Sequence, residues 1–154
     1  MALTIEIPGR ELIELQFLLL DVNGTLSDRG TLLPGVAERL DRLRDRLEPR
    51  LLSADTFGTL ASIGDQLAVP AQRAASGEEK LSVLRRLGPR YCVVIGNGTN
   101  DANILAEAAL GITVIGPEGA SAAALSAADV ICASVLDALD LLAEPRGLAA
   151  TLRA

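Results

Sequence analysis

Residues 17–26 read Phe-Leu-Leu-Leu-Asp-Val-Asn-Gly-Thr-Leu, and residues 92–101 read Cys-Val-Val-Ile-Gly-Asn-Gly-Thr-Asn-Asp. Each stretch is a short, unbroken apolar run that stops at polar and glycine residues. An apolar run of this length bounded by turn residues is typical of a parallel strand that is buried on both faces. The two stretches therefore predict two buried parallel strands, each followed by a loop that carries Asp or Asn.

Strands and helices alternate along the rest of the chain. Alternating residues at 3–7 and 11–15 flank Pro8-Gly9 and predict an N-terminal β-hairpin. Periodicity and cap residues predict further strands at 50–53, 69–74, 112–115 and 130–131, and helices at 36–47, 59–67, 76–87, 100–109, 120–125 and from 135 onward, with Pro49 ending the first helix and Ser76 capping the third. Such alternation predicts an α/β fold, a three-layer doubly wound parallel sheet without a large cap.

Length and composition favour one domain. A chain of 154 residues with 49% hydrophobic residues is long enough for one sizeable core, which we divide into a hairpin (1–15), a core (16–132) and C-terminal helices (133–154). The net charge of −6 disfavours nucleic acid and anionic lipid as partners. The sequence has neither a secretory signal nor an apolar stretch that would span a bilayer, so we expect a cytoplasmic protein.

Residue types that are missing restrict the chemistry. The chain has no His, which excludes a Ser-His-Asp triad, a His base and a His-ligated zinc ion. Lys80 is the single Lys, and all four Asn lie in residues 23–103, in the segments Asp-Val-Asn-Gly-Thr and Gly-Asn-Gly-Thr-Asn-Asp-Ala-Asn. Codon bias can explain this scarcity of Lys and Asn, but it does not explain where they stand.

Asp21, Ser53 and Asn97 each stand where an apolar strand stops. Ligands of doubly wound sheets bind beyond the carboxyl ends of the strands, so the fold would gather these side chains at one edge. Taken singly, each has an ordinary interpretation: Asp21 as a turn residue, Ser53 as a loop or cap hydroxyl, Lys80 as a solvated helix residue and 96–101 as a loop ending in a helix cap. Only their combination and order favour a common site.

In that order, Asp-Val-Asn-Gly-Thr-Leu (21–26), Leu-Ser-Ala-Asp (52–55), Lys80 and Gly-Asn-Gly-Thr-Asn-Asp (96–101) resemble the four signature motifs of the haloacid dehalogenase-like (HAD) superfamily of aspartyl phosphotransferases. Within it, the sequence is most similar to the phosphorylation domain of P-type ATPases. The resemblance covers 17–131 and implies the Rossmannoid sheet of that superfamily.

The resemblance implies roles for particular residues. Asp21 would be the nucleophile that attacks phosphorus, Ser53 would bind a phosphoryl oxygen and Lys80 would neutralise growing negative charge. Mg²⁺ would be bound by Asp21, the backbone carbonyl of Asn23, and Asn97 and Asp101 of the last motif.

The sequence departs from the family pattern twice. Asn23 stands where phosphatases of the superfamily have an Asp that acts as general acid and base, and an amide cannot exchange that proton. P-type ATPases also lack an acid there and have Thr. Asn97 replaces an Asp that is usually a direct metal ligand, so we expect weaker Mg²⁺ binding.

We therefore expect a Mg²⁺-dependent HAD-like phosphohydrolase or phosphotransferase, slow or specialised because of Asn23 and Asn97. The alternative is a non-catalytic phosphate-binding or regulatory module with the same fold. Ser53 follows Asp21 by 32 positions and Lys80 follows Ser53 by 27, so no large cap fits. The open site would take a phosphorylated small molecule or protein, or be covered by a neighbouring subunit in a homo-oligomer.

Overall fold

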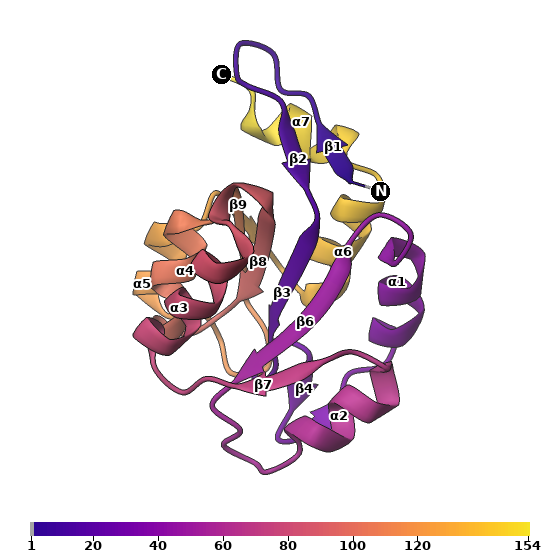
Figure 1. The fold of residues 1–154 in the computed structure, drawn as a ribbon, viewed down its shortest axis with the longest axis vertical. Helices are drawn as coiled ribbons and strands as arrows, with labels where there is room; N and C mark the ends of the chain where they lie inside the picture. The colour runs from indigo at the N-terminus through magenta and orange to yellow at the C-terminus, as the bar shows by residue number, and fades with distance from the viewer. Residues whose placement is uncertain (1) are drawn as a thin grey trace.

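A six-stranded parallel sheet forms the centre of the computed structural model, which describes residues 2–154 (Figure 1). The strand order is β10-β9-β8-β3-β6-β7. From one edge to the other the strands are β10 (Val130–Cys132), β9 (Leu110–Val114), β8 (Cys92–Gly96), β3 (Phe17–Asp21), β6 (Glu48–Ser53) and β7 (Ala71–Arg73). The predicted doubly wound parallel sheet is confirmed.

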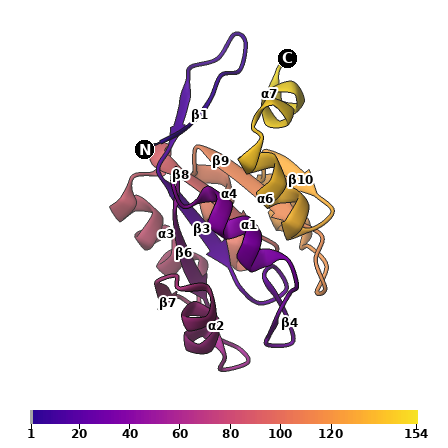
Figure 2. The same cartoon turned by 90° about the vertical axis from the view of Figure 1, so that its right-hand side faces the viewer.

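Helices cover both faces of this sheet. One face carries α1 (Val36–Leu43), α2 (Leu60–Leu67) and α6 (Val135–Ala143), and the other carries α3 (Gly77–Leu87), α4 (Ala102–Glu107) and α5 (Ala122–Ala127). Figure 2 looks onto the layer that contains α1 and α6. Short 3₁₀ turns precede two elements: η1 (Pro89–Tyr91) leads into β8 and η2 (Thr99–Asp101) leads into α4.

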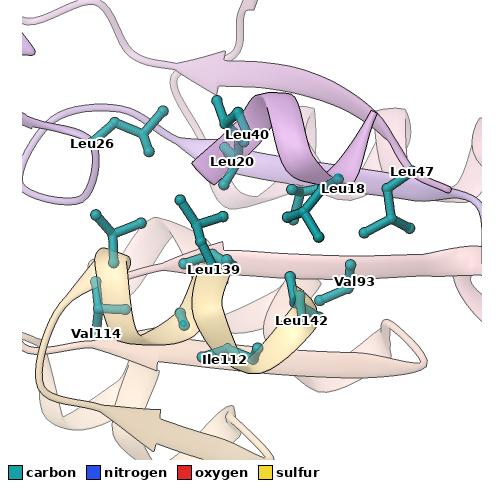
Figure 3. Close-up of a cluster of buried hydrophobic side chains, with 14 of the residues drawn as sticks. Leu18, Leu20, Leu26, Leu40, Leu47, Val93, Ile112, Val114, Leu139 and Leu142 are labelled. Atoms are coloured by element: carbon teal, nitrogen blue, oxygen red, sulfur yellow. The ribbon is translucent and has the colours of Figure 1, made fainter. Parts of the chain in front are cut away.

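The alternation of side chains along β3 divides the core in two. Leu18 and Leu20 pack in the larger apolar cluster with α1 and α6, where Leu40, Leu139 and Leu142 meet them (Figure 3). Leu19 points to the opposite cluster, beneath α3 and α4. Because successive side chains of a strand alternate between faces, Asp21 at the end of β3 belongs to the face that α3 covers.

Two small hairpins flank β3. The predicted N-terminal hairpin is confirmed as β1 (Leu3–Ile5) and β2 (Ile13–Leu15), a separate sheet that contacts α7 (Arg146–Leu152) at the end of the molecule away from the tip of β3 (Figure 1). A second hairpin, β4 (Ser27–Asp28) and β5 (Thr31–Leu32), follows β3 directly. The sequence does not predict this hairpin, because two-residue strands are too short to show the alternation of apolar and polar residues.

The first helix is shorter than predicted. It ends at Leu43 instead of 47, and Pro49 lies inside β6 instead of ending the helix. Proline lacks the N–H that a central strand donates, so it is tolerated only where one side of the strand is unpaired. Pro49 pairs with Leu18 of β3, whereas β7 begins to pair with β6 only at Leu51, which leaves that side of Pro49 free.

Candidate functional site

Lys80 connects two carboxylates in the interior of the protein. It lies in the first turn of α3, whose start is fixed by the Ser76 hydroxyl accepting a hydrogen bond from Glu79 N at 3.1 Å. Lys80 Nζ is 3.0 Å from Asp21 Oδ1 and 2.7 Å from Asp101 Oδ1, and its side chain is completely buried. A buried ammonium with two carboxylate partners is not the solvated helix lysine of the simpler interpretation.

Asp101 is bonded through both of its oxygens. Its Oδ1 accepts from Lys80, and its Oδ2 accepts from the backbone N–H groups of Asn97 and Gly98 at 3.1 and 3.0 Å. It packs so closely on β8 that a Cβ added at Gly96 would be 2.6 Å from its carboxylate carbon. Asp101 therefore holds both the ammonium of Lys80 and the loop after β8.

Thr25 lies between Asp21 and Asn97. Its hydroxyl oxygen is 3.3 Å from Asp21 Oδ2 and 3.2 Å from Asn97 Oδ1, and its side chain is buried. A hydroxyl has one proton to donate, so it can satisfy only one of these two oxygens at a time. Thr25 belongs to the motif at 21–26, but the sequence predicts no role for it. Its position four residues after Asp21 is the one feature of the sequence that points to this contact.

The remaining predicted residues, Ser53 and Asn23, lie at the same edge. Ser53 is buried at the end of β6, one residue beyond Leu52, which pairs with Asp21. Its hydroxyl oxygen accepts from Asp55 N at 2.9 Å, which leaves its proton available to a ligand. Asn23 is half-buried in the turn that follows β3, which is closed by Gly24 N donating to the Ser27 carbonyl at 3.0 Å.

Burial and neighbouring charges change the acidity of the site. The pKa of the Asp21 carboxyl is raised from 3.8 to about 7, first by desolvation and then by repulsion from Asp101, while Lys80 opposes both effects. Burial lowers the pKa of Lys80, but the two carboxylates outweigh burial and hold that pKa above its ordinary value. We conclude that Lys80 is a fixed cation and that Asp21 is the group whose charge is most easily changed.

The residues at this edge of the sheet include possible ligands for the divalent cation that the motifs imply. In residues 2–154, no group of three or more Asp, Glu, Cys or His side chains could by itself hold a metal ion. Asp101 is less available to a cation than Asp21, because it is completely buried and Lys80 and two backbone amides use three of its acceptor sites. Asp21 Oδ2 and Asn97 Oδ1 do fit, because they share the single proton of Thr25 and one of them lacks a donor.

Known proteins resemble this chain in sequence. No protein-family model matches the chain. It is 39% identical over 88 residues to the uncharacterized protein MJ0073 of Methanocaldococcus jannaschii, a match that covers 53% of this chain and 95% of MJ0073. It is 37% identical over 138 residues to a zinc-exporting P-type ATPase of Mycobacterium marinum, which covers 80% of this chain and 19% of the ATPase.

Solved structures share the fold at low identity. A protein described as a HAD-superfamily hydrolase (subfamily III A), from Legionella pneumophila, superposes with a TM-score of 0.70 at 16% identity, covering 90% of this chain and 87% of its own. The 3-deoxy-D-manno-octulosonate 8-phosphate phosphatase of Moraxella catarrhalis, determined with magnesium and phosphate ions, gives a TM-score of 0.69 at 16% identity, covering 86% and 88%.

The parallel sheet has the fold of the haloacid dehalogenase-like hydrolases with solved structures, as the motifs predicted. Asp21, Lys80 and Asp101 lie together at its carboxyl edge. By sequence, the chain belongs to the same family as MJ0073 of M. jannaschii. None of the helices in residues 2–154 has the length and apolar character that a membrane span requires.

Proposed function

We propose that the protein is a HAD-like phosphohydrolase or phosphotransferase in which Asp21 is the nucleophile. The observation that carries the proposal is the buried arrangement of Asp21 and Lys80, 3.0 Å apart at the carboxyl edge of the sheet. A buried lysine paired with two carboxylates costs desolvation free energy and is weak support for stability alone. Its position at the edge where such folds bind ligands supports a functional role.

The proposed reaction uses few groups. Asp21 Oδ attacks phosphorus in line, a bond forms between that oxygen and phosphorus, and the bond from phosphorus to the leaving oxygen breaks. Lys80 stabilises the negative charge on the phosphoryl oxygens, and the Ser53 hydroxyl donates to one of them. The leaving oxygen takes any proton it needs from solvent. Water then attacks the phosphorus of the aspartyl phosphate, the bond between phosphorus and the Asp21 oxygen breaks, and phosphate leaves while the proton of the water passes to solvent.

Mg²⁺ is the proposed cofactor, and Asp21, Asn97 and the carbonyl of Asn23 are the proposed ligands. When bound, the ion would neutralise charge on the phosphoryl group. One carboxylate ligand instead of two predicts weak binding, near the millimolar range, by comparison with the ligand-charge dependence of cation sites. We assign Asp101 to the positioning of Lys80 and the loop, in place of the direct ligand role that its motif suggested.

Asn23 limits the rate in this proposal. General acid and base catalysis contributes about 10²- to 10⁴-fold in enzymes that have it, and an amide cannot supply it. Turnover of an aryl phosphate should therefore be slow, and the aspartyl phosphate should persist longer than in a phosphatase with Asp at this position.

The partners remain predictions. We propose a phosphorylated small molecule or protein as substrate, a cytoplasmic location, and a homo-oligomer in which a neighbour covers the open site. The N-terminal hairpin packs beside α7 of its own chain, away from the tip of β3, so it does not cover the site of its own subunit (Figure 1). Light scattering at micromolar concentration would test association.

The test is whether a phosphoryl group or its analogue attaches to Asp21. We expect beryllofluoride with Mg²⁺ to bind wild type and to raise its melting temperature, and acetyl phosphate to leave an added phosphoryl mass on the peptide that contains Asp21. The Asp21→Asn variant should show neither effect. Phosphate binding that depends on Lys80, without an adduct or turnover, would contradict the enzyme and indicate the non-catalytic module.

A further inference from the structure

The loop between β9 and α5, residues 116–121, is attached to Asn97 twice. The Asn97 side-chain amide Nδ2 donates to the Gly119 carbonyl at 3.0 Å, and the Asn97 carbonyl accepts from Ser121 N at 2.8 Å. Gly119 N donates to the Gly116 carbonyl at 2.9 Å, which closes a tight turn around residues 117 and 118. The loop is therefore held in one place by the residue that departs from the family pattern.

This turn places Glu118 against the motif that contains the nucleophile. A Cβ built on Gly24 would be 2.9 Å from Glu118 Cβ, 3.0 Å from the Glu118 carboxylate carbon and 2.7 Å from Asn97 Nδ2. The Glu118 carboxylate thus lies against Gly24, the residue that follows Asn23, on the side of Asn97 that carries the amide nitrogen. Asn97 and Asn23 are two of the three residues that we propose as ligands of the cation.

Glu118 is free to act on a ligand. Its side chain is exposed, and the ion pairs found in residues 2–154 do not include it. Gly24 itself has a φ of 74° and no room for a side chain, so the close approach of Glu118 to this backbone depends on glycine. An unpaired carboxylate in this position adds negative potential where the site lacks an acid.

The amide at position 97 is compatible with the negative charge of Glu118 on the neighbouring loop, whereas an aspartate there would not be. An aspartate at 97 could not donate to the Gly119 carbonyl, and its charge would repel both that carbonyl and Glu118. An asparagine gives up the charge but gains the hydrogen bond that fixes residues 116–121. The loss at 97 and the carboxylate at 118 are therefore two parts of one arrangement.

We infer that Glu118 supplies the negative charge that Asn97 lacks at the cation site, and that Asn97 is the positioning residue that holds the Glu118 loop there. This inference rests on the proposed function, because it requires a divalent cation beside Asp21. Glu118 acts through the water shell that Mg²⁺ retains in protein sites, so it adds to affinity without being a direct ligand.

The experiment measures Mg²⁺ binding by calorimetry, with Mn²⁺ binding by electron paramagnetic resonance as a second readout. A carboxylate near a divalent ion in a solvated site is worth about a fivefold change in affinity. We expect Glu118→Gln to weaken binding by that factor. The matched control, Glu11→Gln, removes the same charge from the exposed hairpin at the far end of the molecule and should change nothing.

The outcomes separate this inference from the function on which it rests. Wild type that binds neither Mg²⁺ nor Mn²⁺ would overturn the cation site itself. Binding that Asp21→Asn abolishes but Glu118→Gln leaves unchanged would overturn the role of Glu118 alone. Thermal melts of each variant show whether it is folded, since Glu118 is exposed and its replacement should not destabilise the protein.

The role of Asn97 has an independent readout. In Asn97→Asp, the amides of Gly119 and Ser121 should exchange with deuterium faster, because the loop loses its side-chain hydrogen bond. In that background, Glu118→Gln should no longer weaken cation binding. Unchanged exchange together with the same fivefold loss in both backgrounds would show that Asn97 does not position Glu118.

Discussion

The two sides of the candidate site are built differently. On the α3 side, Lys80 and Asp101 are completely buried, and the ammonium and both carboxylate oxygens have partners within 3.1 Å. On the other side, Asn23 is half-buried, and Asn97 competes with Asp21 for the single proton of Thr25. On the first side both oxygens of Asp101 have protein donors, whereas on the second side Asp21 Oδ2 and Asn97 Oδ1 share one donor, which leaves one of them open to water or a ligand.

The difference indicates a division of labour. Buried charges that are held by hydrogen bonds are fixed in position and need no reorganisation when a phosphoryl group arrives, which is what electrostatic stabilisation requires. Amides and an exposed carboxylate leave room for a cation and its water. Substitutions on each side test this division, and the first of them is at Asp21, which the two sides share.

Asp21→Asn should have the largest effect. Removing the nucleophile leaves no group that can form the covalent intermediate, so p-nitrophenyl phosphate hydrolysis with Mg²⁺ should fall by at least about 10³-fold. The measurement is steady-state release of nitrophenol. Activity that survives this substitution would mean that Asp21 is not the nucleophile.

Lys80→Met tests the complete side. It leaves two buried carboxylates without their cation, which should lower the free energy of unfolding by about 3–5 kcal/mol in urea denaturation. The matched control is Arg146→Met, which breaks the pair of Arg146 with Glu144, where the side chains are 89% and 67% exposed, and should cost less than about 1 kcal/mol. Equal losses in the free energy of unfolding would show that the buried pairs of Lys80 contribute no more to stability than an exposed pair.

Asn23→Asp tests the amide side. Restoring an acid at this position should raise hydrolysis of an aryl phosphate by about 10²-fold, the lower end of general acid–base catalysis. If the rate does not change while Asp21→Asn is inactive, another group supplies the proton.

A chemical control belongs to the same experiment. Asn23-Gly24 and Asn97-Gly98 are of the kind that deamidates, in which the backbone N of the glycine attacks the Asn side chain. Both of these N–H groups are hydrogen-bonded, Gly24 N to the Ser27 carbonyl and Gly98 N to Asp101, so the folded protein should deamidate slowly. Intact mass measured before and after the assay checks this expectation.

The pH dependence of stability follows from the acidity of Asp21 and can be measured without substrate or cation. Burial raises the pKa of Asp21 to about 7 from an ordinary value of 3.8, with repulsion by Asp101 adding and Lys80 opposing. Between these values the folded chain binds a proton that the unfolded chain has lost, so the free energy of unfolding should fall as pH rises from 4 to 7. Urea denaturation in EDTA should show this fall in wild type and a smaller one in Asp21→Asn.

Much of the fold could be predicted from periodicity. The buried strands β3 and β8 were predicted almost to the residue, because an apolar run with polar residues at its end has few other structures available. The first helix was predicted four residues too long, since Leu47 continues its apolar period but belongs to the turn before β6. The β4–β5 hairpin was missed, because two-residue strands carry no period.

The site was predicted as a set of motifs but not as a set of contacts. The sequence identified Asp21, Asn23, Ser53, Lys80, Asn97 and Asp101, and the structure brings all six to one edge of the sheet. It could not show that Asp101 binds Lys80 and backbone amides, nor that Thr25 joins Asp21 to Asn97. Those facts depend on contacts between residues that are up to 72 positions apart in the chain.

The sequence by itself determined the strand ends and therefore which side chains share the carboxyl edge, because β periodicity and the parallel sheet leave them no other place. Only the tertiary structure decided the partner of each side chain. Lys80 is buried between two acids because the face of β3 that carries Asp21 is covered by α3, and Glu118 lies against Gly24 because the Asn97 amide holds its loop. Such contacts are set by packing between distant segments, on which local sequence has no influence.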